Sequence, residues 1–304
     1  MIKRTIEISS AGVFLSVEMD QLVIRWEGDE LQRVPIEDIG VLIIDTYGAT
    51  YTHAVITRLL SAGAVIVPCD GRHLPCGLLL GQDNCLQTQR LATQVQAALP
   101  LRKQLWRQVV SAKIAHQAEM LGHAPAVQSA LRGMSRRVRS GDPENLEAQA
   151  ARRYWPAMLG AEFRRDPDGS PPNNFLNYGY MAIRAAVARA IAGAGLHPSL
   201  GLHHHNRSNA FCLADDLVEP LRPLVDRRVR ALHQAGRYDI DKDAKRGLLE
   251  VLTETVRLAD TAGPLLVALE RMAASLARCY AGEIRRLEIP VPWKSADTDS
   301  CGCW

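Results

Sequence analysis

The chain has 304 residues, of which 47% are hydrophobic and 23% are charged, and its formal net charge is +3. This length and apolar content favour two globular domains with cores of their own. No apolar run follows Lys3 and Arg4, and no stretch of about eighteen apolar residues occurs, which argues against a signal peptide and a membrane span. We therefore expect a soluble, cytoplasmic protein. Its seven cysteines form no CxxC pair, so we expect reduced thiols rather than a zinc ribbon or a disulfide framework.

The small net charge hides a division along the chain. Residues 1–85 carry 6 Lys and Arg against 11 Asp and Glu, a net charge of −5, whereas residues 86–304 carry 30 against 22, a net charge of +8. The basic second part is therefore the part that we expect to bind a polyanion.

Residues 1–85 are predicted to form a β-rich domain. Short runs rich in Ile, Val and Leu, separated by turn residues at hairpin spacing, cover residues 4–8, 12–17, 21–26, 31–35 and 39–45. Thr52 can cap a short helix that reaches Leu60 and ends at Gly63, and residues 64–68 then form a buried strand.

After residue 85 the hydrophobic period becomes that of helices. Helical periodicity covers residues 86–98, 102–121, 125–138, 143–159, 174–193, 213–234, 243–258 and 262–285. We therefore predict an α+β chain, with an all-α domain over residues 86–288 after the β-rich one. Residues 289–304 contain two prolines followed by Ser, Asp, Gly and Cys, which is typical of a flexible tail.

Three consecutive histidines, His203, His204 and His205, precede Asp215, Asp216 and Glu219, which lie eleven to fifteen residues after His204. Imidazoles and carboxylates this close together have the donor types of a divalent-metal site. A polar loop before a solvated first helical turn would have the same composition, because acids are common at helix starts. The local sequence leaves both interpretations open.

Two upstream clusters are equally ambiguous when each is taken alone. Glu147 lies on an alanine-rich predicted helix, where an exposed acid paired with Arg152 or Arg153 is the ordinary interpretation. The segment Asn174-Phe-Leu-Asn-Tyr-Gly-Tyr180 could be a capped helix start whose tyrosines pack in the core.

The order of these clusters resembles a known family. The glutamate in its alanine-rich helix, Asn-Phe-Leu-Asn-Tyr-Gly-Tyr, Leu-His-Pro-Ser-Leu-Gly-Leu-His-His and Ala-Asp-Asp-Leu-Val-Glu-Pro-Leu-Arg-Pro follow one another as in the CRISPR adaptation integrase, the larger, catalytic subunit of spacer acquisition. Residues 34–39 and 59–67 resemble the first domain of that family, so the resemblance covers residues 3–288. The short length and the His-His form resemble its type II branch.

The resemblance implies a β-sandwich-like dimerisation domain over residues 1–85 and a catalytic helical domain over residues 86–288. It implies that Glu147, His204 and Glu219 are the catalytic metal ligands. His203 and His205 remain possible substitutes for His204. Many relatives have aspartate at the position of Glu219, which leaves the ligand geometry open. The remaining supporting residues are Asp216, Asn177 and Tyr178, and core packing is the favoured interpretation for Tyr178.

This donor set suits Mg²⁺, and a histidine nitrogen favours Mn²⁺. The implied reaction is attack by the 3′-hydroxyl of a captured DNA fragment on a phosphodiester of the CRISPR array, and the same site would cut DNA with water as the nucleophile. The implied partners are double-stranded DNA, a second copy of the chain and a small ferredoxin-like adaptation subunit. Our candidates for phosphate contacts are Arg137, Arg152, Arg164, Arg165, Arg184 and Arg222, although any of them can instead be a helix-surface residue.

Two other functions remain open. A metal-dependent hydrolase of small substrates would use the same His and acidic residues, but it predicts an enclosed apolar pocket and does not require the +8 charge of the second part. A catalytically idle DNA-binding scaffold would not require ligand-type side chains at Glu147, His204 and Glu219, all of which are present.

Overall fold

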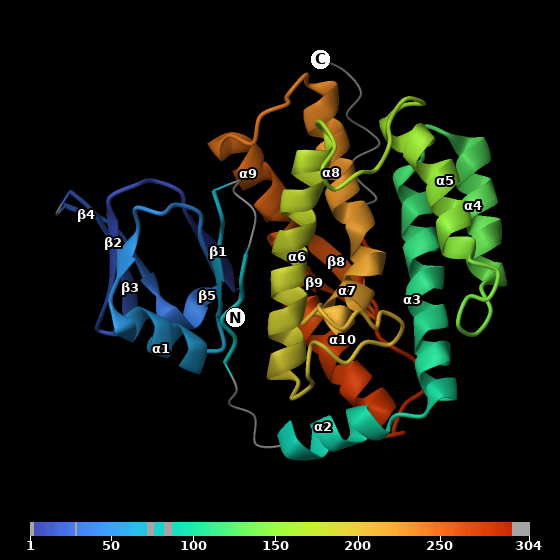
Figure 1. The fold of residues 1–304 in the computed structure, drawn as a ribbon, viewed down its shortest axis with the longest axis horizontal. Coiled ribbons are helices and arrows are strands. Elements are labelled where there is room, and N and C mark those ends of the chain that lie inside the picture. The colour runs from blue at the N-terminus through green and yellow to red at the C-terminus, as the bar shows by residue number, and fades with distance from the viewer. Residues whose placement is uncertain (1–2, 28, 72–75, 82–86, 294–304) are drawn as a thin grey trace.

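The computed structural model describes residues 3–27, 29–71, 76–81 and 87–293, which form a β-rich N-terminal part and a largely helical C-terminal part (Figure 1). The predicted boundary between residues 85 and 86 lies outside the described residues, as do residues 294–304 of the predicted tail. The four described cysteines, Cys69, Cys76, Cys212 and Cys279, are free thiols.

Two sheets build the N-terminal part. The first is parallel and has the strand order β1-β5-β7, and the second has the order β4-β3-β2-β6. The strands and the helices between them are β1 (Arg4–Ile8), β2 (Val13–Glu18), β3 (Gln21–Trp26), β4 (Asp29–Pro35), η1 (Ile36–Asp38), β5 (Ile39–Ile44), β6 (Thr50–Tyr51), α1 (His53–Ser61) and β7 (Val65–Pro68). The predicted strands and short helix are thus confirmed, and the two-residue β6 was too short to predict.

Strand β5 is buried along its whole length because it has a core on each face. Leu42 and Ile44 pack with Leu15 and Ile24 of the second sheet, whereas Val41 and Ile43 belong to the core of the helical part. This explains why residues 39–44 are uniformly apolar rather than alternating.

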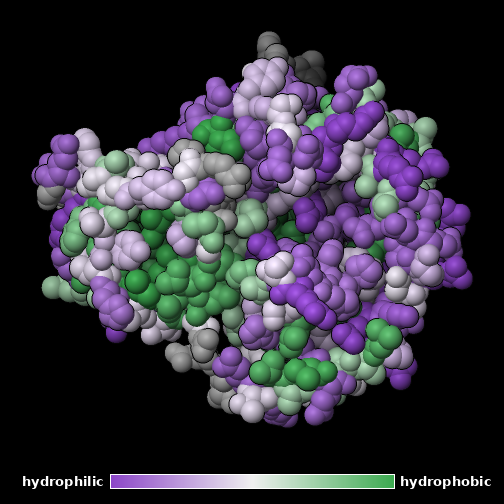
Figure 2. All heavy atoms as spheres, in the orientation of Figure 1, coloured by the Kyte–Doolittle hydropathy of each residue, from purple (hydrophilic) through white to green (hydrophobic). Residues whose placement is uncertain are grey.

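The helical part is built around α6, whose apolar side chains lie in the core that also contains α3, α8 and α10. Its helices are α2 (Gln87–Gln96), α3 (Leu99–Met120), α4 (Pro125–Arg137), α5 (Leu146–Leu159), α6 (Asn173–Gly193), α7 (Cys212–Val218), η2 (Glu219–Leu221), α8 (Arg222–Gln234), α9 (Lys242–Leu249), η3 (Glu250–Thr253) and α10 (Leu265–Tyr280). No helix within the described ranges is long and apolar enough to cross a membrane. On the face shown in Figure 2, hydrophobic residues gather over the N-terminal part and hydrophilic ones over the helical part.

The expectation that the second domain is all-α is wrong. An antiparallel sheet of order β10-β8-β9 is formed by β8 (Thr255–Leu258), β9 (Thr261–Pro264) and β10 (Val291–Pro292). In β8 the burial alternates residue by residue, which is a strand period, and Ala259 adopts a positive φ of 50° in the turn to β9. Only the α9 portion of the predicted helix 243–258 is an α-helix, and the predicted helix 262–285 begins at Leu265.

Two further sequence expectations differ from the structure. The predicted helix 213–234 is divided into α7, η2 and α8, because Pro220 and Pro223 interrupt the backbone hydrogen bonding of one continuous helix. In the predicted tail, Val291 and Pro292 pair with Arg257 and Val256 of β8, so this described portion is attached to the helical part.

Candidate catalytic site

Helix α3 forms one wall of the candidate site. Trp106 and Lys113 are seven residues apart, which places them within about 20° of each other on the same side of a helix. The Trp106 side chain stacks against His203 with a centroid separation of 4.4 Å, and the ring of His204 is edge-on to Trp106 with a centroid separation of 5.9 Å. Two turns further along α3, Lys113 faces the predicted glutamates.

Lys113 joins Glu147 and Glu219, which are 72 residues apart in the sequence. Its Nζ donates to Glu147 Oε1 and to Glu219 Oε2, each at 2.5 Å, so the two oxygens are at most 5.0 Å apart. Burial alone would lower the pKa of Lys113, but the charges of Glu219 and Glu147 more than offset it and raise the pKa above its usual value. The two acids therefore converge on a single position that holds a cation.

Glu147 is fixed by the start of α5. Asn145 has a left-handed backbone with a φ of 50°, and its side chain accepts the N–H of Ala148 at 3.3 Å. The carboxylate of Asp142 accepts the N–H groups of Leu146 and Glu147 at 2.9 and 3.0 Å. These caps satisfy the free donors of the first turn and set the position from which Glu147 projects.

Glu219 is buried and charged. Its Oε1 accepts Arg222 Nε at 3.0 Å while Lys113 binds its other oxygen. Burial alone would raise the pKa of Glu219, but the charges of Arg222 and Lys113 and the hydrogen bond from Lys113 lower the pKa to about 2. The side chain is thus an anion with a cation on each oxygen.

Asp216 organises the histidine loop. The fully buried carboxylate accepts the backbone N–H groups of Leu202, His203 and His204 at 2.6, 3.0 and 3.3 Å, and it binds His204 Nδ1 at 2.6 Å. The hydrogen bond to Asp216 raises the pKa of His204. Gly201 is needed beside it, because a Cβ there would lie 2.4 Å from the His204 carbonyl oxygen.

The three histidines therefore have different surroundings. Nδ1 of His204 is engaged by Asp216, which leaves Nε2 as the ring nitrogen available to a ligand. The charges of Glu219 and Glu147 also raise the pKa of His204, which places this imidazole within electrostatic range of both acids. His203 is stacked on Trp106, and His205 is exposed.

Within the described part of the chain, no three metal-ligating side chains are arranged so that they could hold a metal ion as they stand. The reason at this site is visible in the contacts: the Lys113 ammonium lies between the two glutamates, and His204 is turned toward Asp216. Two carboxylates bound to one cation, with an imidazole within range, nevertheless match the donor types that Mg²⁺ and Mn²⁺ accept.

A pocket of about 510 Å³ adjoins Glu219 through Arg222. Its lining contains four of the predicted residues, Asn177, Arg165, Arg184 and Arg222. Arg165 donates to Asn177 Oδ1 at 2.7 Å, and Arg184 binds the carboxylate of Asp215 at 2.6 and 3.1 Å.

Tyr180 anchors two of the pocket's cations. The guanidinium groups of Arg222 and Arg165 lie 4.5 and 5.6 Å from the centre of its ring. The hydroxyls of Tyr180 and Tyr154 both donate to buried Asp226 on α8. Tyr180 therefore supports the arginine pocket, and its own position is fixed by the hydrogen bond to Asp226.

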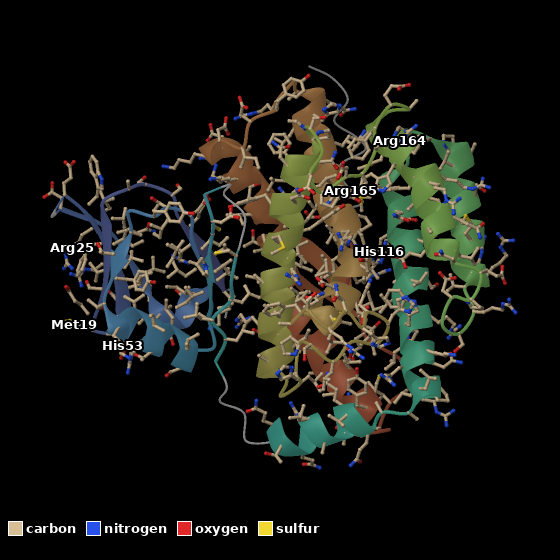
Figure 3. The ribbon with its side chains drawn as sticks, in the orientation of Figure 1. Met19, Arg25, His53, His116, Arg164 and Arg165 are labelled. Atoms are coloured by element: carbon tan, nitrogen blue, oxygen red, sulfur yellow. The ribbon has the colours of Figure 1, made fainter. Side chains whose placement is uncertain are left out.

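The other predicted arginines lie elsewhere. Arg137 at the end of α4 and Arg152 on α5 are exposed. Arg164 is also exposed and donates to the carbonyls of Ala161 and Phe163 in its own loop. Figure 3 shows Arg164 further out on this loop than Arg165, which lies beside α6.

Tyr178 does not line this site. It is 1% exposed, and its charged neighbours are Glu7, Asp45 and Lys245, at the contact between the N-terminal sheet and the helical part. Residues 178 and 180 are two positions apart on α6 and therefore face nearly opposite sides of it. Its position fits packing in the core, the interpretation favoured from the sequence, and does not fit a supporting role at this site.

Sequence reasoning missed Lys113, Trp106 and Asp226. The first two lie in a helix with no local motif, and only their spacing of seven residues hints at a shared side. Asp226 lies in a run of charged residues on α8, where a solvated acid is the ordinary expectation. Each acquires its role from contacts with residues far away in the sequence.

Residues 6–257 match the sequence profile of the family described as "CRISPR associated protein Cas1". The "CRISPR-associated endonuclease Cas1" of Neisseria meningitidis serogroup C (strain 8013) is 38% identical over 278 residues, which is 90% of each chain. The solved structure of a "Casposase bound to integration product" has a TM-score of 0.79 at 19% identity, covering 97% of this chain and 95% of that one. A chain of a "Cas6-RT-Cas1--Cas2 complex" has a TM-score of 0.75 at 18% identity, covering 97% of this chain and 36% of that one. The two structures share the fold, and the profile together with the Neisseria relative shows that the chain belongs to the Cas1 family of CRISPR-associated proteins.

Proposed function

We propose that this chain is a metal-dependent DNA endonuclease and integrase that inserts captured DNA fragments into a CRISPR array. A terminal 3′-hydroxyl of the fragment would attack a phosphodiester of the array. The observation that carries the proposal is the position of Lys113 Nζ, 2.5 Å from both Glu147 and Glu219, which marks a cation site connected through Arg222 to the arginine-lined pocket.

The side chains around Lys113 fit Mg²⁺ or Mn²⁺. Glu147, Glu219 and Nε2 of His204 would hold the ion, and Asp216 would orient the imidazole as a carboxylate behind a histidine ligand does. When bound, a divalent ion supplies Lewis-acid stabilisation of the charge that develops on the phosphate oxygens. Arg222 keeps Glu219 ionised and in place for this purpose.

The arginine pocket would hold the DNA backbone beside the acids. Arg165 and Arg222 lie over Tyr180, so their guanidinium planes are oriented before a phosphate arrives. Arg184 is already paired with Asp215, which makes it a weaker candidate for a phosphate contact. The exposed Arg137, Arg152 and Arg164 would add contacts that position the duplex without reading its sequence.

Two similar solved structures support the proposed partners. One structural neighbour is bound to an integration product, and another belongs to a complex with Cas2. For this chain we propose double-stranded DNA, a Cas2-type small subunit and a second copy of the chain as partners. The N-terminal part exposes Phe14, Leu31, Tyr47 and Tyr51, which are apolar side chains suited to the proposed dimer contact.

Strand transfer of a short duplex with free 3′-hydroxyls into a repeat-containing plasmid tests the proposal. We expect Glu147→Gln, His204→Ala and Glu219→Gln each to reduce the rate at least about a hundredfold, because each removes a ligand from the site that stabilises charge in the transition state. DNA affinity at fixed salt should change little. Activity should depend on Mg²⁺ or Mn²⁺ and should be lost in a chelator.

Glu144→Gln is the matched control, since its side chain is exposed and lies three residues before Glu147. It should retain the wild-type rate. Full activity of one ligand variant would remove that residue from the site. Persistent strand transfer in a chelator would reject metal dependence, and DNA binding without strand transfer in the wild-type protein would favour the idle scaffold.

A further inference from the structure

Helix α3 lines a second groove on the side opposite Lys113. Ser111 and Ala115 are each two residues from Lys113, which places them about 160° around the helix from it. Together with Ala112 they line a groove of about 770 Å³ between α3, α4 and the C-terminal sheet. Their small side chains leave this space open, and the body of α3 separates it from Glu147 and Glu219.

The far wall of the groove is fixed to α3. Gln108 donates to the Arg285 carbonyl at 3.0 Å and accepts the Leu287 N–H at 2.9 Å. The segment after α10 is thereby held beside α3, and it continues into β10, which pairs with β8. The groove is a built feature of the fold, since two hydrogen bonds and a strand pairing define its wall.

Four arginines converge on this groove, and the carboxylate that lines it with them, Glu119, is bound by Arg132. Arg107 on α3, Arg257 on β8 and Arg286 after α10 line it, and all three are exposed. None of the three has an ion-pair partner among the residues that the structure describes. Only Arg132, which donates to Glu119 at 2.8 Å, is already paired. Most of the cations in the catalytic pocket, by contrast, are held by carboxylates.

The basic surface extends beyond the groove. A neighbouring hollow of about 860 Å³ shares Arg257 and Arg286 with it and adds Arg285 and Arg278, of which Arg278 is paired with Glu283. The acids Asp260 and Glu288 also line this hollow. At the other end, Trp293 follows β10 with 44% of its surface exposed. A track of guanidinium groups with an exposed aromatic side chain beside it has the components of a single-strand binding site.

We propose that this groove binds single-stranded nucleic acid, with Arg107, Arg257 and Arg286 on the phosphates and Trp293 stacked on a base. The site is separate from the catalytic pocket, and α3 lies between them. The strand held here is therefore not the one whose phosphodiester reacts at Glu147 and Glu219. An acidic peptide would satisfy the arginines but would leave the indole without a stacking partner, so nucleic acid is the better fit.

Binding of a fluorescein-labelled fifteen-nucleotide oligothymidylate to the full chain tests the proposal. We expect Arg257→Ala/Arg286→Ala to weaken binding at least tenfold and to reduce the slope of log affinity against log salt by about 1.4, because about 0.7 is lost per phosphate contact on single strands. Trp293→Leu should weaken binding about five- to hundredfold, the range found when a stacking aromatic is removed. The oligonucleotide should quench tryptophan fluorescence in the wild type more than in Trp293→Leu.

Arg58→Ala/Arg246→Ala is the matched control, because both arginines are exposed and lie in neither pocket. It should retain wild-type affinity and salt slope. An affinity loss in the groove variant no larger than in this control would overturn the proposal. It would also be overturned if a polyglutamate peptide displaced the oligonucleotide at equal ionic strength, or if Trp293→Leu bound and quenched as the wild type does. The strand-transfer rate at saturating substrate should be unchanged in the groove variants, so this test and that of the catalytic site fail independently.

Discussion

A lysine between two acids is the residue-level feature that distinguishes this site from a solvated cluster. The Lys113 side chain is 12% exposed and that of Glu219 is 7% exposed, so water screens their interaction only weakly. Without a cation at this position the two carboxylates would repel each other in a poorly solvated space. Lys113 thus supplies the charge balance that a divalent ion would also supply.

The first prediction concerns Lys113, because its ammonium group and a divalent ion would occupy the same position. Lys113→Met should lower the melting temperature in a chelator, since Glu147 and Glu219 lose their shared counter-charge. Adding Mn²⁺ should then raise the melting temperature more than in the wild type, because the ion no longer competes with an ammonium for the same oxygens. Thermal unfolding against Mn²⁺ concentration measures both effects. Lys103→Met, an exposed change on the same helix, is the control, and equal Mn²⁺ shifts in both variants and the wild type would contradict the argument.

Asp226 gives a pH-dependent prediction. Burial raises the pKa of Asp226 to about 6 from an ordinary value of 3.8, although the hydroxyls of Tyr180 and Tyr154 partly oppose the rise. Between these two values the native state binds more protons than the unfolded state, so this group's contribution to stability falls as the pH rises through that window. Relative to Asp226→Asn, the wild type should lose up to about 3 kcal/mol between pH 4 and pH 7. Urea unfolding at several pH values measures the difference, and parallel stability profiles would disprove it.

At the scale of elements, the local hydrophobic pattern of the sequence predicted most of the helices and strands. The strands of residues 4–44 were predicted from short apolar runs between turn residues, and the helices up to residue 193 were predicted from their helical period. The method failed at β8 and β9, where four-residue strands are too short to show a period against flanking helices. The predicted helix 213–234 was also wrong at η2, because proline interrupts the helix there although the apolar pattern continues.

The candidate site shows the same limit. The order of the motifs predicted Glu147, His204 and Glu219 as the metal ligands. In the structure both glutamates bind the ammonium group of Lys113. Lys113 could not be predicted, because its role depends on how α3 packs against α5 and η2. The motif left Tyr178 open between a supporting role and the favoured core packing, because a motif does not reveal which side of a helix faces which neighbour.

The close packing of α6 on α8 gives an element-level prediction. A Cβ at Gly179 would lie 2.4 Å from Val225 Cγ1, and Val225 is fully buried. We expect Gly179→Ala to destabilise the protein by about 1–3 kcal/mol, despite the better helix propensity of alanine, because the core there is already filled. The double variant Gly179→Ala/Val225→Ala should be more stable than the sum of the single effects predicts. Chemical unfolding of all four proteins provides the cycle, and additive effects would show that the two residues do not compete for space.

A buried ion pair joins the two parts of the molecule beside the apolar core that they share. Asp45, after β5, is bound by Lys245 of α9, and the side chains are 0% and 5% exposed. Glu7 of β1 lies near the same lysine, and burial raises the pKa of Glu7. Arg189 of α6 adds a second connection by donating to the Gly63 carbonyl at 2.5 Å. These contacts fix the N-terminal sheet against the helical part, which carries the candidate catalytic groups.

Removing Lys245 should therefore weaken the attachment of the two parts. We expect Lys245→Met to cost about 3–5 kcal/mol, because Asp45 would remain buried without a counter-charge. Lys245→Met/Asp45→Asn should recover part of that loss, since the charge is removed together with its partner. Urea unfolding measures the free energies, and Lys242→Met, an exposed change three residues earlier on α9, should be close to neutral. If the double variant were as unstable as Lys245→Met, the loss would come from packing around the lysine stem, and the charge pair would not be what joins the two parts.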